Sequence, residues 1–463
     1  MEKAIIANGL PKKGHSMEYT LMLAVIAGMA VLLFMILRLK LPAFIALLFA
    51  AIITGLLSGM DPSKLMDAVK NGMGGTLGFV ATIVGLGTIF GGILQHTGSA
   101  GIVATQLLRI FGERRAPWAL MITGFLVSIP IFFDVGIVIL FPVVAALQEK
   151  TGKNIIHFAL PLLAGLAVSH AFIPPTPGPL AVAEILGVPL GWMVAVGIIC
   201  GLPAAYVAGI WYGKYAAVSI QPVQRIYVQE SIASTRAVPN VWSVFAILLL
   251  PILLIIGSTV LEGVNTDMKE SFAFKVLLMF CHPFSALIIA NILAWYILGR
   301  HTGVSATELS GITAKSLQPA GMIILVTGAG GVFKQILMDT GAGKMIADSM
   351  QYAGFSLLIF AFLAAAAIRI MQGSATVAMI TAAGLVAPLL PSYQLVDGQL
   401  AALGVAIASG ATVLSHLNDS GFWLIKEYFS LTEREGIRMW TVASSLLGIT
   451  GLILSAIVYY SFG

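Results

Sequence analysis

Charged residues are scarce in this sequence. Lys, Arg, Asp and Glu make up 10% of its 463 residues, and 59% of the residues are hydrophobic. Soluble domains contain about 25% charged and roughly 45–50% apolar residues, because charged groups cover their surfaces. With a mean hydropathy of +0.98, the composition excludes a soluble enzyme and a disordered chain. It predicts an all-α polytopic membrane protein.

Cysteine is also scarce. Cys200 and Cys281 both lie inside apolar runs, where cysteine is usually a small packing residue rather than a disulfide or metal ligand. The net charge of +5 is spread along the chain, so no nucleic-acid partner is expected. The sequence has no metal-spaced cluster, no phosphate-binding Gly-Lys-Ser/Thr and neither hydrolase motif, His-Glu-x-x-His or Gly-x-Ser-x-Gly. We therefore expect no metal, no cofactor and no enzyme or ATP-driven pump.

Long apolar runs fill most of the chain. A membrane span needs about 20 apolar residues, and the following segments are expected to be spans: 20–37, 42–59, 76–95, 156–188, 190–212, 241–261, 276–298, 317–337, 397–428 and 437–461. Segment 20–37 is interpreted as a retained first helix and not as a signal peptide.

Two further apolar stretches, 118–148 and 355–391, are interrupted near the middle, at residues 128–130 and 372–374. Each arm is marginal or too short for a full span, which favours re-entrant hairpins.

Charge placement favours an N-terminus outside the membrane. In that topology the inside segments hold more Lys and Arg than the outside segments, as the positive-inside rule requires. The basic N-terminal tail favours the opposite orientation. The polar segment 213–240 is expected to be a cytoplasmic linker between two repeats, 1–212 and 241–463.

Short motifs recur in the two halves. Residues 94–98 (LQHTG) match 337–341 (LMDTG), and 178–184 match 421–427, both shifted by 243 positions. The predicted topology gives the two copies opposite orientations. Inverted repeats with discontinuous helices are a signature of secondary transporters.

The span after each hairpin is itself interrupted. Residues 170–179 contain four prolines, and residues 414–421 (LSHLNDSG) form the most polar stretch inside any span. Unwound backbone is tolerated in a bilayer only where it is buried in protein or lines a cavity. The two hairpin tips and the two breaks therefore mark one candidate site, where helix N-termini attract a carboxylate.

At these positions the sequence resembles the gluconate:proton symporter (gluconate permease) family, within the wider ion-transporter superfamily. The similarity runs from about residue 19 to the end and is carried by four motifs: Phe132-Phe133-Asp134-Val135-Gly136, residues 169–179, Arg369-Ile370 with residues 373–378, and residues 415–423.

The resemblance implies proton-coupled import of gluconate or a related sugar acid or hydroxy acid across the bacterial inner membrane. It also implies an elevator-type mechanism, in which a transport domain of hairpins and broken helices slides against a dimeric scaffold, and therefore a homodimer. The chain departs from the family where Thr176 replaces a frequent His and where Asp134 replaces the Glu of many sugar-acid members. Because D-serine members have Asp there, a D-serine or glycerate symporter is the alternative.

Two intramembrane carboxylates are candidates for proton coupling. The alternative for Asp134 is an N-cap on the second hairpin arm, and for Asp419 it is local bonding to backbone groups of the break. His170 and His416 are candidates for proton relay or for binding substrate hydroxyls, with a structural hydrogen bond as the alternative. Arg369 is expected to pair with the substrate carboxylate, unless it neutralises a buried acid or extends to water.

The remaining expected substrate contacts are hydroxyls, amides and backbone groups at the tips and breaks. They are Ser169, Thr176, Gly178, Gly373, Ser374, Thr376, Ser415, Asn418, Ser420 and Gly421. Hydroxyls in membrane helices also bond to their own backbone, so each of these has a structural alternative. A channel-like facilitator is the less favoured function, because a channel does not require ionisable residues at its breaks.

Overall fold

The computed structural model describes residues 12–220, 239–263, 267–299 and 302–462, and the regular structure in these ranges is helical. The first half contains α1 (Lys12–Leu37), α2 (Ala43–Leu57), α3 (Pro62–His96), α4 (Ser99–Phe111), η1 (Glu113–Arg115), α5 (Ala116–Val127), α6 (Phe133–Thr151), α7 (Ile156–Phe172), α8 (Pro177–Leu186), α9 (Leu190–Ala205), η2 (Tyr206–Trp211) and α10 (Tyr212–Ser219).

The second half contains α11 (Val241–Gly263), η3 (Asp267–Glu270), α12 (Phe272–Cys281), α13 (Pro283–Leu293), η4 (Ala294–Gly299), α14 (Ala306–Asp339), α15 (Ala342–Tyr352), α16 (Leu357–Gln372), α17 (Ala375–Val386), η5 (Ala387–Ser392), α18 (Asp397–Gly410), α19 (Ser420–Tyr428), α20 (Glu433–Gly436), η6 (Ile437–Thr441) and α21 (Val442–Ser461). Within the described ranges, eight helices are long and apolar enough to cross a membrane, or up to ten if each of two bent pairs counts as one span. The prediction of an all-helical polytopic membrane protein is confirmed.

Several segments differ from the sequence prediction. The expected span 276–298 is not one straight helix, because α12 and α13 are bent by 64° between Cys281 and Pro283. Spans were expected at 76–95 and 317–337, but α3 and α14 begin at Pro62 and Ala306. Good N-caps explain the early starts, because the Asp61 side chain accepts from the N–H groups of Ser63 and Lys64 and the Ser305 hydroxyl accepts from Glu308 N. The short helices α4 and α15 likewise occupy segments expected to be loops.

The interrupted stretches are also helical on both sides of the interruption. The first hairpin tip, residues 128–132, separates α5 from α6, and the second, residues 373–374, separates α16 from α17. The arm Ala375–Ser392 is long and apolar enough to cross a membrane alone. The length of this arm therefore does not favour a re-entrant hairpin.

Most of the predicted linker, residues 221–238, lies outside the described residues. Its first part continues the preceding span, which runs to Ser219 and not to residue 212. Cys200 and Cys281 are buried and free, as expected of packing residues.

The order of elements recurs in the two halves of the chain. In each, a long helix (α3 or α14) leads into a short amphipathic helix (α4 or α15), a helix pair with a break, an interrupted span and a closing span. A left-handed glycine precedes each short helix, Gly98 with φ +68° and Gly341 with φ +72°. The relative orientation of the two halves in the membrane stays a prediction.

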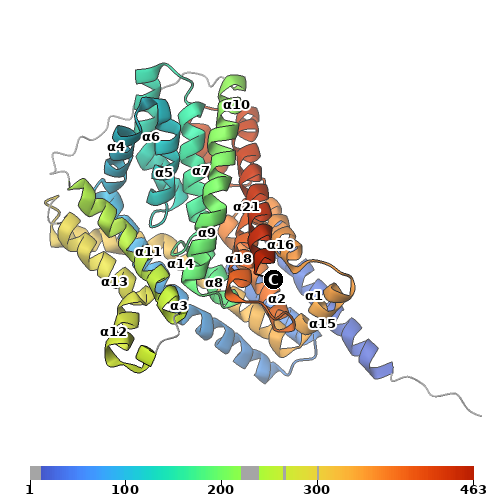
Figure 1. The fold of residues 1–463 in the computed structure, drawn as a ribbon. Coiled ribbons are helices and arrows are strands. Elements are labelled where there is room, and N and C mark those ends of the chain that lie inside the picture. Colours follow the sequence, from blue (N-terminus) through green and yellow to red (C-terminus); the bar gives the residue numbers. More distant parts are fainter. Residues whose placement is uncertain (1–11, 221–238, 264–266, 300–301, 463) are drawn as a thin grey trace, which may run out of the picture.

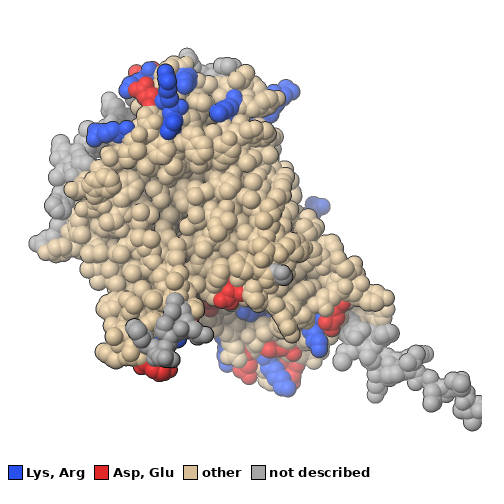
Figure 2. Space-filling view, in the orientation of Figure 1, with Lys and Arg blue, Asp and Glu red and all other residues tan. Residues whose placement is uncertain are grey.

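The arrangement leaves a wide apolar zone on the face of the molecule that Figure 2 shows. In Figure 1 the ends of α4, α5, α6, α7 and α10 gather at the top, and α1 and α15 lie at the lower right. Figure 2 shows a band largely without charged side chains on this face. Lys and Arg predominate at the upper end, and both signs are mixed at the lower end.

Glycine contacts hold the first hairpin arm against the first interrupted span. A Cβ atom at Gly165 of α7 would lie 2.1 Å from the Met121 carbonyl oxygen of α5, and one at Gly124 of α5 would lie 2.4 Å from that of Leu162. Only glycine permits so close a backbone approach. This contact fixes the first hairpin tip, residues 128–132, beside the end of α7, where His170 lies.

Candidate functional site

The breaks of both halves meet around one cavity of about 570 Å³. Its walls come from α6, α7, the α16–α17 turn, residues 411–421 and η6, with one residue of α14. The lining residues are Phe132, Phe133, Asp134, Val135, Ala167, His170, Ala171, Ile323, Arg369, Gln372, Gly373, Ser374, Ala375, Thr376, Ala411, Thr412, Ser415, Asn418, Asp419, Ser420, Gly421 and Trp440. This volume is within the usual range for small-molecule sites, roughly 300–1,000 Å³.

Most of the predicted site residues line this cavity. They are Asp134, His170, Arg369, Gly373, Ser374, Thr376, Ser415, Asn418, Asp419, Ser420 and Gly421. The other four, Ser169, Thr176, Gly178 and His416, lie outside it. Residues from positions more than 280 apart in the sequence are thereby brought to one place.

A buried ion pair joins the second hairpin tip to the second break. Arg369 on α16 donates through Nη2 to Asp419 Oδ2 and through Nη1 to the Gly373 carbonyl oxygen. The exposed fractions of the two side chains are 6% for Arg369 and 14% for Asp419. Of the alternatives for Arg369, neutralisation of a buried acid is therefore the one that the geometry shows.

Asp419 has further partners that fix its carboxylate. The Ser415 hydroxyl donates to Oδ2, and Gly421 N donates to Oδ1 at 3.1 Å, so that Asp419 is the N-cap of α19. Ser415 is itself held, because Trp440 Nε1 donates to its hydroxyl oxygen at 2.8 Å. Of the two interpretations of Asp419, the alternative of local bonding to the backbone of the break is the one that the geometry shows.

The backbones of the tip and the break touch at Gly373. This residue has φ +88°, and a Cβ atom there would lie 2.1 Å from the Asn418 carbonyl oxygen. The Asn418 amide donates in return to the Ile370 carbonyl oxygen at 2.7 Å. Glycine is thus required at this position for both its conformation and its size.

Asp134 has a different environment. It is the second residue of α6, and Phe132 is the N-cap, so the alternative that Asp134 caps this helix is wrong. Ser374 does cap α17, by accepting from Val377 N at 3.4 Å. The Asp134 side chain is exposed to the cavity, and within the described part of the chain it has no hydrogen-bond or ion-pair partner.

His170 lies in the last turn of α7. Its ring packs edge-on against Phe132 with 6.1 Å between centroids, and its Nδ1 is buried without a hydrogen-bond partner. Ser169 is fully buried and its hydroxyl also has no partner in the described residues. His416 is half-buried outside the cavity, where its Nδ1 accepts from Asn418 N at 3.4 Å.

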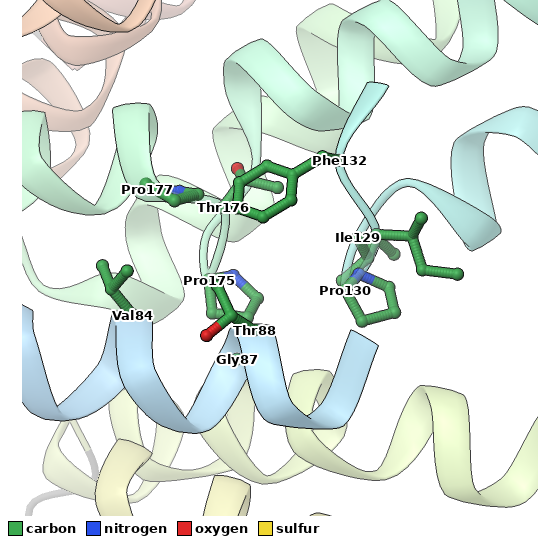
Figure 3. A pocket seen from close by; sticks show the side chains of 10 residues that line it. Val84, Gly87, Thr88, Ile129, Pro130, Phe132, Pro175, Thr176 and Pro177 are labelled. Carbon is green, nitrogen blue, oxygen red and sulfur yellow. The ribbon is translucent and has the colours of Figure 1, made fainter. Parts of the chain in front are cut away.

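Thr176 and Gly178 belong to the first break, on the side facing α3. The Thr176 hydroxyl donates to the Ile173 carbonyl oxygen, and Gly178 packs against the side chain of Met379. Figure 3 shows Pro175 and Thr176 facing Pro130 and Phe132 across a very small space above α3. Thr176 therefore packs the first break against the first hairpin tip, whereas Gly178 packs against α17.

Sequence reasoning missed several lining residues. Trp440 of η6 stacks on Phe133 with 5.5 Å between ring centroids, and Thr412 donates its hydroxyl to Ala408 O at 2.7 Å. Gln372 was recognised only as part of the interruption at residues 372–374. A polar residue beside Gly373 in an apolar stretch could have indicated a lining residue.

Arg369 is not the only basic residue inside an apolar helix of the described chain. Lys334, inside span α14, donates to the Ile185 carbonyl oxygen at the end of α8 at 2.6 Å.

The assembled cavity combines few fixed charges with many neutral polar groups. Two carboxylates and one guanidinium face it, together with the hydroxyls of Ser374, Thr376 and Ser420 and the amide of Gln372. The N-termini of α6, α17 and α19 also begin at its wall, and such termini attract anions. This chemistry suits a small, hydroxylated anion.

Comparison with known proteins agrees with this chemistry. A model of the GntP family of permeases matches residues 19–460. The chain is 36% identical over 444 residues to a low-affinity gluconate transporter of Escherichia coli, which covers 95% of this chain and 98% of that protein. It is 37% identical, with the same coverage, to a gluconate permease of Pseudomonas aeruginosa. The Gnt-II system L-idonate transporter of Escherichia coli is 35% identical over 433 residues, covering 93% and 97%.

Two solved transporter structures share the fold. The YdaH transporter of Alcanivorax borkumensis aligns with a TM-score of 0.65 at 15% identity, over 90% of this chain and 97% of that one. MtrF of Neisseria gonorrhoeae, described as illuminating a class of antimetabolite efflux pumps, aligns with a TM-score of 0.60 at 18% identity, over 86% and 84%.

Proposed function

The chain belongs to the GntP family of permeases, and from this premise we propose that it imports gluconate or a closely related sugar acid together with protons. Membership of this family makes the protein a membrane transporter and not an enzyme, and places it as a multi-pass protein in the bacterial inner membrane. The relatives that transport gluconate and L-idonate support a sugar acid as substrate.

The unpaired carboxylate of Asp134 carries the proposal of proton coupling. Arg369 and Asp419 already neutralise each other, so an ionised Asp134 gives the cavity an uncompensated negative charge. A sugar acid adds a second one, and two like charges in a cavity of low dielectric repel strongly. A proton on Asp134 removes this repulsion, which links the binding of the substrate to the uptake of a proton.

The substrate carboxylate is assigned to the helix N-termini and not to Arg369. Arg369 is committed to Asp419 and Gly373, whereas α6 begins at the cavity without a side-chain cap. The N–H groups of its first turn are therefore open to an anion. The hydroxyls and amides around the cavity serve the substrate hydroxyl groups.

The transport mechanism belongs to the same proposal. The recurrence of the element order supports two inverted repeats, and the cation-rich end of the molecule supports a cytoplasmic side at the α4–α6 and α10 ends. In an elevator mechanism the elements around the cavity, α5–α9 and α16–α21, move as one body against α3, α14 and the scaffold of a homodimer.

A competition panel tests the substrate class. Uptake of labelled gluconate into vesicles holding the purified protein is measured at several pH values against unlabelled galactonate, glycerate and D-serine. We expect the sugar acids to compete and the uptake to rise with external proton concentration. Competition by D-serine alone contradicts the proposed substrate.

A further inference from the structure

Gln372 is the lining residue that neither the sequence motifs nor the ion-pair network explains. It is the last residue of α16, and its side chain lines the cavity. Its amide oxygen Oε1 is fully buried and accepts no hydrogen bond within the described residues. A buried polar atom without a partner costs about 1–3 kcal/mol, so its retention at the cavity wall points to a partner that arrives with the substrate.

The backbone around Gln372 is held rigidly. Gly373 follows it in the left-handed conformation against Asn418, and Arg369, one turn earlier on α16, bonds the Gly373 carbonyl oxygen. The amide is therefore presented from a fixed position, as a specificity group requires.

A second buried atom without a partner belongs to the same turn of α16. Arg369 Nε is a donor with no acceptor in the described residues, and residues three apart in a helix are neighbours on one face. One acceptor and one donor at the end of α16 therefore both lack a hydrogen-bond partner among the described residues. A hydroxyl group supplies one hydrogen and accepts another, whereas a carboxylate has no hydrogen to give to Gln372.

We propose that Gln372 is a specificity-determining residue that binds one hydroxyl group of the sugar acid, with Oε1 accepting from the hydroxyl and Arg369 Nε donating to it. The inference rests on the proposed function, since it names the part of the substrate that this wall recognises. A site built to bond a hydroxyl rejects an analogue lacking it, because its own buried groups are then left unpaired.

The test uses the full-length protein and measures how well unlabelled compounds displace labelled gluconate. The compounds are gluconate and the series of its single-deoxy analogues. In the unchanged protein, one analogue is expected to bind at least about ten-fold more weakly than gluconate, because it loses the bonds to both Gln372 and Arg369. Gln372→Met, which keeps the length and removes the amide, is expected to bind gluconate about ten-fold more weakly. It should distinguish gluconate from that analogue less than the unchanged protein does, because only the bond from Arg369 Nε remains, while the ratios for the other analogues stay the same.

Gln351→Met is the matched control, because Gln351 on α15 lies outside the cavity and donates to the Ser392 carbonyl oxygen. It should leave every ratio unchanged. If Gln372→Met is not recovered folded, Gln372→Asn, which withdraws the amide by one methylene, is judged by the same criterion.

The outcomes separate the two proposals. Unchanged ratios in the Gln372 variant, or no discrimination among deoxy analogues by the unchanged protein, overturn the role of Gln372 and leave the sugar-acid function standing. Failure of the unchanged protein to bind gluconate or any other sugar acid overturns the proposed function, and the role of Gln372 with it.

Discussion

At the scale of single residues, the two carboxylates of the cavity have opposite surroundings. Asp419 accepts from Arg369, Ser415 and Gly421, whereas Asp134 faces the cavity with no bonded partner among the described residues. We infer that Asp419 holds the site together and that Asp134 is free to change its protonation state during transport.

This division of roles predicts different effects on stability. Asp419→Asn leaves the buried Arg369 charge uncompensated and should lower the free energy of unfolding by about 3–5 kcal/mol. Asp134→Asn should change it by less than about 1 kcal/mol, since no bond is broken. Unfolding of both variants in detergent, followed by tryptophan fluorescence, provides the comparison.

A double-mutant cycle tests the pair itself. Arg369→Gln combined with Asp419→Asn should be less destabilised than the sum of the single variants by at least about 1 kcal/mol, because neither charge is then left alone. Strict additivity would show that the two side chains do not interact in the folded protein.

The residues of the site were only partly predictable from sequence. Asp134, Arg369 and Asp419 stand out because charges are rare within spans, and breaks at proline and glycine indicate where they meet. The choice of Asp419 as partner for Arg369 depends on how the tip folds onto the break, which no local pattern encodes. Gln372 and Trp440 carry no charge, so they were overlooked.

At the scale of elements, the contact between the α16–α17 turn and the second break depends on one glycine. Gly373→Ala places a methyl group against the Asn418 carbonyl oxygen and adds about 1–2 kcal/mol for the left-handed conformation. We expect gluconate uptake to fall at least ten-fold. Gly354→Ala is the matched control, because Gly354 also has a positive φ, +63°, but has no atom within 4 Å of a Cβ position.

Loss of uptake in Gly373→Ala with normal uptake in Gly354→Ala is the expected result. Equal loss of uptake in both variants would mean that the left-handed conformation matters and the contact with Asn418 does not. Normal uptake in both variants would contradict the requirement for glycine at position 373.

The start of α3 gives a pH-dependent prediction. Hydrogen bonds from the Ser63 hydroxyl and from the N–H groups of Ser63 and Lys64 lower the pKa of the Asp61 carboxyl below its usual value of 3.8. A group whose pKa is lower in the folded state stabilises the fold above its unfolded pKa, and this contribution disappears as the pH falls through the folded pKa. Asp61→Ala should therefore lower the melting temperature more at pH 7 than at pH 2, where the protonated carboxyl caps the helix only as a neutral acceptor.

Asp61→Asn, which can still cap the helix but does not titrate, is the control. A melting difference between Asp61→Ala and the unchanged protein that is the same at both pH values would contradict a titrating cap.

The ends of helices could be predicted where the length of an apolar run decides them. They could not be predicted where an N-cap decides them. The apolar runs located most spans, but the polar first turns of α3 and α14 looked like loops. Their helical starts follow from Asp61 and Ser305, whose side chains bond the free N–H groups. The helices α4 and α15 were missed for a different reason, because both are too short to be recognised as spans.

At the scale of the whole molecule, the charge asymmetry predicts which end faces the cytoplasm. The native cysteines are buried, so a single introduced cysteine reports its own side of the membrane. Lys150→Cys, at the end of α6, should react with an impermeant maleimide only after spheroplasts are opened. Lys70→Cys, on α3, should react in intact spheroplasts. The reverse pattern would show that the proposed orientation is inverted.

The central claim is that a proton on Asp134 accompanies each imported sugar acid. The most direct measurement follows external pH when gluconate is added to proteoliposomes holding either the unchanged protein or Asp134→Asn. The unchanged protein should make the medium more alkaline, and Asp134→Asn should abolish this change while still exchanging gluconate for gluconate, because Asn resembles the protonated carboxyl. Alkalinisation that survives in Asp134→Asn would contradict the claim.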